Sequence, residues 1–140
     1  MRGRVLAVDY GSRRIGLALS DPTGTATEPL PTVERRGDDQ AAREVAEVAR
    51  RRGARTVVVG LPLRLDGTEG PQAQAVRRFA RRLEQYTGVP VRLWDERLTS
   101  VQAERLLVDG GIRRARRRLL RDQLSAALLL RSFLEAHPDP

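Results

Sequence analysis

Five short apolar runs, each followed by polar or turn-forming residues, predict the strands of a buried sheet. The predicted strands cover residues 5–8, 15–20, 26–34, 56–59 and 89–94. The third contains Pro29 and Pro31, which have no backbone N–H to give to a ladder. We therefore expect that strand at an edge of the sheet.

Between and after these strands, apolar residues recur at helical spacing. The predicted helices cover about residues 38–52, 71–87, 99–108 and 119–136. Three strands thus come first, and strands alternate with helices afterwards. That order predicts an α/β domain with a mixed sheet, antiparallel at its start and parallel in its later crossovers.

The chain is strongly basic, and one residue type carries the positive charge. All 26 basic residues are arginine, against 18 acidic residues, and the net charge is +8. Arginine binds phosphate through a planar, bidentate fork, so this charge suits a polyanionic partner such as nucleic acid. A GC-rich codon bias is the alternative explanation, and it accounts for the absence of lysine whatever the partner.

The inventory of reactive side chains is narrow. The chain has no cysteine and a single histidine, His137, close to the C-terminus. This composition excludes a disulfide framework, a cysteine nucleophile and a zinc site built from cysteine and histidine. Any chemistry must therefore use carboxylates, hydroxyls, arginines or a metal ion held by oxygen.

Length and hydropathy fit one domain away from the membrane. With 140 residues, 40% of them hydrophobic, the chain fits a single domain over residues 1–140. No run approaches the ~20 continuous apolar residues of a membrane helix. The first apolar run is too short for a signal peptide, so we expect a cytoplasmic protein without a membrane partner.

Two carboxylates come just after predicted strands. Asp9 comes after the first strand and Glu96 after the fifth. If those strands are parallel, both side chains emerge at the carboxyl edge of the sheet, where α/β domains carry functional groups. The alternatives are structural: a turn residue for Asp9, and an ion pair with Arg97 or a helix cap for Glu96.

Asp122 is the most informative acid. It shares a helical face with Ala126, Leu129, Leu130 and Phe133, which form a packing stripe. We therefore expect Asp122 to project toward the sheet, near the start of its helix, where the helix dipole favours negative charge. A buried carboxylate is costly unless it is paired or bound to a metal, so an ion pair with an arginine is the alternative.

Three carboxylates at one edge would repel one another unless cations lie between them. Mg²⁺ and Mn²⁺ prefer such oxygen ligands, and two ions ~3.5–4 Å apart can drive an in-line phosphoryl displacement. Asp9, Glu96 and Asp122 are therefore our candidate catalytic and metal-binding residues, with Mg²⁺ or Mn²⁺ as cofactor.

Four segments resemble the YqgF/RuvX family, relatives of the RuvC Holliday junction resolvases within the ribonuclease H-like superfamily. They are VLAVDYGSRRIGLALSD (5–21), VVVGLPLRLDGTEG (57–70), VRLWDERLTSVQAERLL (91–107) and RDQLSAALLLRSFLE (121–135). Together they cover most of the chain in the family's order and spacing, and the first and third are specific in combination.

The resemblance implies a ribonuclease H-like three-layer fold, with a five-stranded mixed sheet flanked by helices. It also implies a metal-dependent nuclease whose metal-binding acids fall on Asp9, Glu96 and Asp122. Members are described as processing the 5′ end of pre-16S rRNA in ribosome biogenesis, and some as Holliday junction resolvases of DNA recombination and repair. The chain departs from the pattern at Arg121 and Ser125, neither of which is a metal ligand.

Arginines gather in the sequence around the three acids and are candidates for contacting phosphates. The candidate nucleic-acid-binding residues are Arg13, Arg14, Arg97, Arg113, Arg114, Arg116, Arg117, Arg118 and Arg121. Only 4% of the residues are aromatic, which is few for base stacking on single strands. Recognition of the backbone and shape of a folded or duplex substrate is therefore favoured.

Two other functions compete with the nuclease. The stretch Asp9-Tyr10-Gly11-Ser12 is also typical of actin-like ATPases, but those need a second large lobe for which 140 residues leave no room. A non-catalytic protein that binds nucleic acid through its arginines is the third hypothesis. Pre-rRNA and branched DNA both stay open as partners of the nuclease, as do a monomer and a homodimer.

Overall fold

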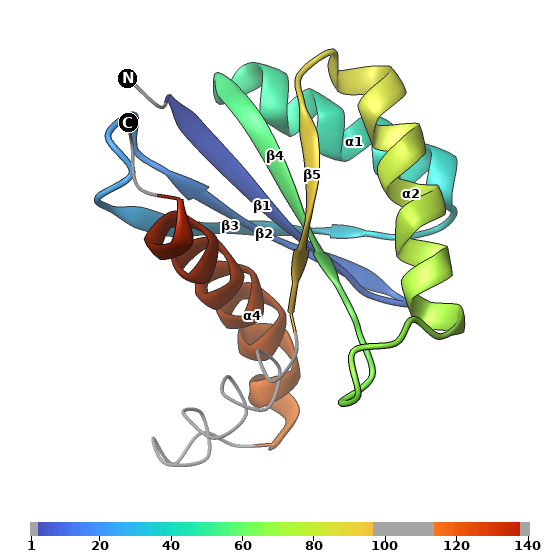
Figure 1. The fold of residues 1–140 in the computed structure, drawn as a ribbon. Coiled ribbons are helices and arrows are strands. Elements are labelled where there is room, and N and C mark those ends of the chain that lie inside the picture. Colours follow the sequence, from blue (N-terminus) through green and yellow to red (C-terminus); the bar gives the residue numbers. More distant parts are fainter. Residues whose placement is uncertain (1–2, 97–113, 138–140) are drawn as a thin grey trace.

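Five strands form one mixed sheet in the computed structural model. The structure describes residues 3–96 and 114–137, and for residues 114–123 it describes the backbone only. The strands are β1 (Arg4–Tyr10), β2 (Arg14–Ser20), β3 (Thr27–Glu34), β4 (Ala54–Leu61) and β5 (Val91–Asp95), in the spatial order β3-β2-β1-β4-β5. β2 pairs antiparallel with β1 and β3, whereas β4 runs parallel to β1 and β5 (Figure 1). The predicted mixed sheet is confirmed, and β3 lies at an edge, as its prolines indicated.

Helices cover both faces of this sheet. α1 (Asp38–Arg51) and α2 (Pro71–Thr87) lie on one face, and α4 (Arg114–Ala136) lies on the other (Figure 1). α2 has a proline at its first position, where no N–H is needed, and it ends at Gly88, whose φ of 70° is left-handed. The helix predicted at residues 99–108 falls outside the described residues.

The core is split by the sheet into two clusters. On the α1–α2 face, Leu6 and Val8 of β1 pack in a cluster with Phe79 and Leu83 of α2. On the other face, Val5 and Ala7 of β1 belong to a cluster with Leu129, Leu130 and Phe133 of α4. Because side chains alternate along a strand, the residue that follows Ala7 on the α4 face is Asp9.

Helix α4 is held on the sheet by the stripe predicted for it. Ala126, Leu129, Leu130 and Phe133 are all buried. Trp94 of β5 packs edge-on against Phe133, with ring centroids 5.6 Å apart, and its Nε1 donates to Ser132 Oγ at 3.1 Å. These contacts fix the rotation of α4 about its axis, and with it the face on which each of its positions lies.

The start of α4 differs from the prediction. The helix begins at Arg114 and not near Leu119, so Asp122 lies more than two turns inside it. The helix dipole acts within about the first turn, so our expectation that the helix start favours the Asp122 charge is wrong.

None of the helices in the described part of the chain combines the length and the apolar composition of a membrane-spanning segment.

Candidate active site

Asp9 and Glu96 meet at the carboxyl edge of the sheet. Asp9 is the penultimate residue of β1, and Glu96 directly follows β5. The parallel strand β4 lies between them, and the backbone N–H of Glu96 donates to the carbonyl of Leu61 at its end, at 3.2 Å. We expected the two acids to emerge at one edge if β1 and β5 were parallel. Both strands run parallel to β4, so their carboxyl ends do lie at the same edge.

The two carboxyl groups are hydrogen-bonded to each other, which requires one of them to carry a proton. Burial, then the charge of Asp9 and the hydrogen bond to it, and finally the charge of Asp95 raise the pKa of Glu96 to about 8. Without a bound cation, burial and the neighbouring charges therefore favour the protonated form of the Glu96 carboxyl group at neutral pH. The charges of Asp9 and Asp95 thus act in the direction expected of clustered carboxylates, since each disfavours ionised Glu96.

Gly60 makes room for the Glu96 carboxyl group. It lies in β4, on the α4 face, and a Cβ built on it would be 2.1 Å from Glu96 Oε2 and 2.9 Å from Glu96 Cδ. No other residue type leaves the Glu96 side chain in this place. Sequence reasoning treated Gly60 only as the end of a strand; the available signal was a glycine inside an otherwise apolar run.

Asp122 is described through its helix only. Its position in α4 precedes the buried residues Ala126 and Leu129 by four and seven positions, which is the spacing of one helical face. The structure does not describe its side chain. Among the described residues, no group of three histidine, cysteine, aspartate or glutamate side chains that could hold a metal ion is found. Its place as the third acid of the site therefore stays a prediction.

The donor set suits a hard divalent cation. Asp9 and Glu96 offer only carboxylate oxygens, the ligands preferred by Mg²⁺ and Mn²⁺. Two acids crowded closely enough to share one proton present the negative charge that a divalent cation would neutralise. The residues thus fit the predicted kind of metal site.

The structure describes the candidate arginines to different degrees. Arg13 is exposed in the turn after β1, and Arg14 begins β2. Arg97 and Arg113 lie outside the described residues. Arg114, Arg116, Arg117 and Arg118 are part of α4 itself, not of a segment before it as the predicted helix start implied, and Arg121 lies in α4 as predicted. Whether their side chains bind nucleic acid stays a prediction.

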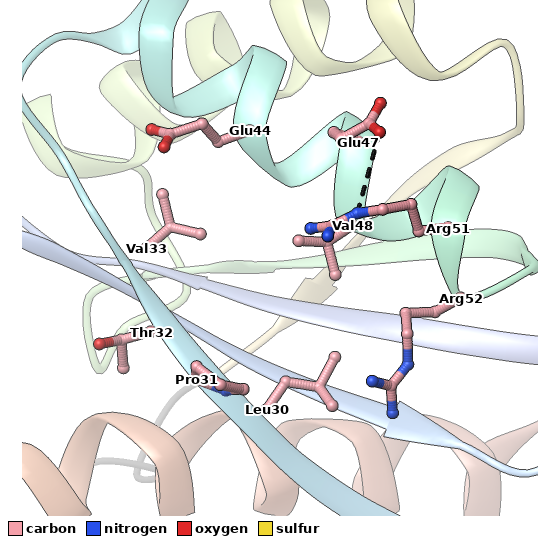
Figure 2. A pocket seen from close by; sticks show the side chains of 9 residues that line it. All are labelled: Leu30, Pro31, Thr32, Val33, Glu44, Glu47, Val48, Arg51 and Arg52. Carbon is pink, nitrogen blue, oxygen red and sulfur yellow. Dashed lines mark ion pairs between the residues drawn. The ribbon is translucent and has the colours of Figure 1, made fainter.

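A cavity of about 640 Å³ lies elsewhere, between the edge strand β3 and helix α1 (Figure 2). Leu30, Pro31 and Val48 form part of its wall, and Glu47 and Arg51 form an ion pair at its rim. It opens on the α1 side of the sheet, whereas the paired acids lie on the α4 side. None of its lining residues is a predicted site residue.

A three-layer α/β domain with paired acids at the carboxyl edge of its sheet defines a ribonuclease H-like protein of the nuclease and resolvase class. The profile of the RuvX family, described as Holliday junction resolvase, matches residues 3–136. The chain belongs to this family, as the four sequence segments indicated.

Curated relatives match over nearly the whole chain. One from Syntrophus aciditrophicus is 45% identical over 133 residues, which cover 95% of this chain and 89% of that protein. One from Moorella thermoacetica is 43% identical over 132 residues, or 94% of each chain. Both carry the name "Putative pre-16S rRNA nuclease". The family match and the names of these relatives support the nuclease over the actin-like ATPase.

Solved structures share the fold at low sequence identity. T. thermophilus RuvC, in complex with a Holliday junction substrate, has a TM-score of 0.57 and 20% identity over 97% of this chain and 96% of that chain. The fowlpox virus resolvase, in complex with substrate Holliday junction DNA, has a TM-score of 0.60 and 14% identity over 97% of this chain and 99% of that one. These likenesses confirm the ribonuclease H-like fold.

Proposed function

We propose that this protein is a divalent-metal-dependent nuclease that processes the 5′ end of pre-16S rRNA in the cytoplasm, with Asp9, Glu96 and Asp122 as its metal-binding and catalytic acids. The meeting of Asp9 and Glu96 at the carboxyl edge of the sheet, where burial and their charges raise the pKa of Glu96, carries this proposal. Like-charged carboxylates are costly to hold together, and a purely structural role gives no reason to do so.

The residues of the chain prepare this site for hydrolysis of a phosphodiester. Gly60 lets the Glu96 carboxyl group lie against the sheet, and Glu96 must release its proton before both acids can bind a cation. A bound Mg²⁺ or Mn²⁺ supplies the Lewis acidity that activates a water and stabilises the leaving oxygen. Asp122, from the sheet-facing stripe of α4, completes the proposed ligand set.

The substrate proposal favours RNA because the curated relatives are named for pre-16S rRNA. A four-way DNA junction is the second candidate, since the family is described by Holliday junction resolution. The basic surface proposed around the site suits the backbone of either substrate.

A cleavage assay on both substrates tests the proposal. The purified protein is incubated with a 5′-extended 16S rRNA precursor and with a four-way DNA junction, in Mg²⁺, in Mn²⁺ and in EDTA. We expect metal-dependent cleavage of the precursor at its 5′ extension, and loss of cleavage in Asp9→Asn, Glu96→Gln and Asp122→Asn. Binding of Mn²⁺, followed by calorimetry, should weaken in the same three variants.

Asp21→Asn is the matched control. Asp21 also follows a strand directly, but β2 runs antiparallel to β1, so Asp21 lies at the opposite edge of the sheet. Its variant should cleave and bind Mn²⁺ as the wild type does. Cleavage that survives EDTA, or that persists in all three acid variants, would refute the mechanism. If only the four-way junction is cleaved, the substrate is DNA and not RNA. If either substrate is bound but neither is cleaved, the protein is a non-catalytic nucleic-acid-binding protein.

A further inference from the structure

The turn between β1 and β2 follows Asp9 closely and is tightly built. A Cβ on Gly11 would come 2.3 Å from the backbone oxygen of Arg14, so this turn needs glycine at its first position. Ser12 and Arg13 are exposed at its tip. Because the turn leaves the carboxyl end of β1, it lies at the edge of the sheet that carries Asp9 and Glu96.

Arg35, just beyond the end of β3, fastens this turn through two successive carbonyl groups. Its backbone N–H donates to the carbonyl of Arg13 at 2.7 Å, and its Nη1 donates to the carbonyl of Ser12 at 2.8 Å. Both contacts are to the main chain of the turn, so they restrain its backbone and leave its side chains unconstrained.

The guanidinium of Arg35 is itself held in place. Its Nε donates to Asp38 Oδ1 at 2.9 Å, and the hydroxyl of Tyr10 donates to the same oxygen at 2.6 Å. The guanidinium also lies 5.0 Å from the centroid of the Tyr10 ring. Burial, with the nearby Asp38 carboxylate, raises the pKa of Tyr10 to about 12, so this hydroxyl stays a donor at any physiological pH.

Arg13 is in the opposite situation. It is exposed, and none of the ion pairs between described residues includes it. Arg35, by contrast, is 29% exposed and already paired with Asp38, so its own charge is largely compensated. Arg35 thus restrains the backbone of the turn, and Arg13 is exposed at its surface.

We infer that Arg35 is a positioning residue that preorganises the Gly11–Arg13 turn so that Arg13 can bind a phosphate of the nucleic-acid backbone. This inference rests on the proposed function. A loose turn would have to be ordered during binding, and that ordering would weaken affinity. Arg35 therefore acts on binding through the main chain of the turn, without touching the substrate.

A double-mutant cycle on Arg35 and Arg13 tests this inference. Affinity for the rRNA precursor and for the four-way junction is measured by fluorescence anisotropy in EDTA over a series of salt concentrations. The proteins are the wild type, Arg35→Gln, Arg13→Gln and the double variant. The matched control is Arg36→Gln, which removes the same charge from the next residue, whose side chain is 69% exposed.

We expect Arg13→Gln to weaken binding about tenfold and to reduce the slope of log affinity against log salt by about 1. Arg35→Gln, which keeps the backbone hydrogen bond to Arg13 but loses the one to Ser12, should weaken binding by at least about threefold, and the double variant should be no weaker than Arg13→Gln alone. Arg36→Gln should change affinity less than about twofold. Arg35→Gln behaving like Arg36→Gln, or effects of Arg35 and Arg13 that simply add, would overturn the inference.

A second measurement uses the protein alone. The ¹⁵N relaxation of the Ser12 and Arg13 amides should show faster internal motion in Arg35→Gln than in the wild type and in Arg36→Gln. In Arg35→Lys, which keeps the positive charge but lacks the planar guanidinium, the motion of these amides should be intermediate between that in Arg35→Gln and that in the wild type. This variant also replaces Arg35→Gln in the test if Arg35→Gln does not fold. Unchanged relaxation in either variant would refute the role of Arg35. A wild type that binds neither substrate in EDTA and cleaves neither in Mg²⁺ or Mn²⁺ would refute the proposed function instead, whatever the relaxation shows.

Discussion

The carboxyl group of Glu96 lies directly against Gly60 of the neighbouring strand. The space between them is so small that a Cβ at position 60 would stand 2.1 Å from Glu96 Oε2, and 3.1 Å from Leu129 Cδ2 of helix α4. The sheet, the candidate active site and α4 thus meet at one glycine, and the absence of a side chain there determines where Glu96 can be.

Gly60→Ala should therefore impair the site more than the fold. The added methyl group must displace the Glu96 carboxyl group, which is a flexible side chain, before it disturbs the strand. We expect cleavage to fall by at least about tenfold, as when the support of a metal ligand is lost. The decrease is measured as kcat at saturating substrate and Mg²⁺.

Gly37→Ala is the control for that substitution. Gly37 precedes α1, and its Cβ would meet nothing within 4 Å. Its variant should cleave at the wild-type rate. If Gly60→Ala cleaves equally fast while its Mn²⁺ affinity is unchanged, the Glu96 position is not important for catalysis.

The shared proton predicts how stability depends on pH. The folded protein holds a proton on Glu96 with a pKa of about 8, against an ordinary value of 4.5. The folded state therefore binds this proton more tightly than the unfolded state, and the stability that the protonated group provides is complete below about pH 4.5. It is lost as the pH rises toward about 8.

Urea unfolding in EDTA, compared with Glu96→Gln, isolates this contribution. Other groups titrate in both proteins and largely cancel, whereas glutamine carries no proton to lose. The free energy of unfolding of the wild type, minus that of Glu96→Gln, should decrease between about pH 4.5 and about pH 8 and level off above. A difference that is constant over this range would show that the Glu96 pKa is not raised.

The positions of two acids could be read from the sequence because a general rule determines them. Asp9 and Glu96 each follow an apolar run, and parallel strands bring such positions to one edge. The role of Gly60 could not be read in this way. It depends on the register between β4 and β5, where Gly60 pairs with Trp94, and register is a property of the assembled sheet.

The start of α4 was misplaced for a different reason. The apolar stripe that predicts a helix begins only after the arginine-rich residues 113–118, but arginine favours helix and extends it in the N-terminal direction. The Arg35 contacts were also beyond sequence reasoning. They join residues 22 and 23 positions apart, through a turn whose geometry no local pattern specifies.

Two leucines of opposite exposure provide a test of the core. Leu83 of α2 is 0% exposed and packs in the cluster on the α1–α2 face, whereas Leu65 in the loop after β4 is 82% exposed. Leu83→Ala should reduce the free energy of unfolding by about 2–5 kcal/mol. Leu65→Ala should change it by less than about 0.5 kcal/mol. Urea unfolding followed by circular dichroism measures both, and equal effects would contradict the placement of α2.

The arginines in the first turns of α4 should contribute to binding and not to the chemical step. Arg116→Ala combined with Arg117→Ala removes two charges from the first turns of the helix that carries Asp122, and the slope of log affinity against log salt should fall by about 2 on duplex or junction DNA. Arg50→Ala with Arg51→Ala removes the same charge from the end of α1, where both arginines pair with Glu47, and should leave the slope unchanged. At saturating substrate, kcat should be the same in both double variants. If the α1 pair weakens binding as much as the α4 pair, the affinity reflects the net charge of the protein, and the start of α4 has no special role in holding the substrate.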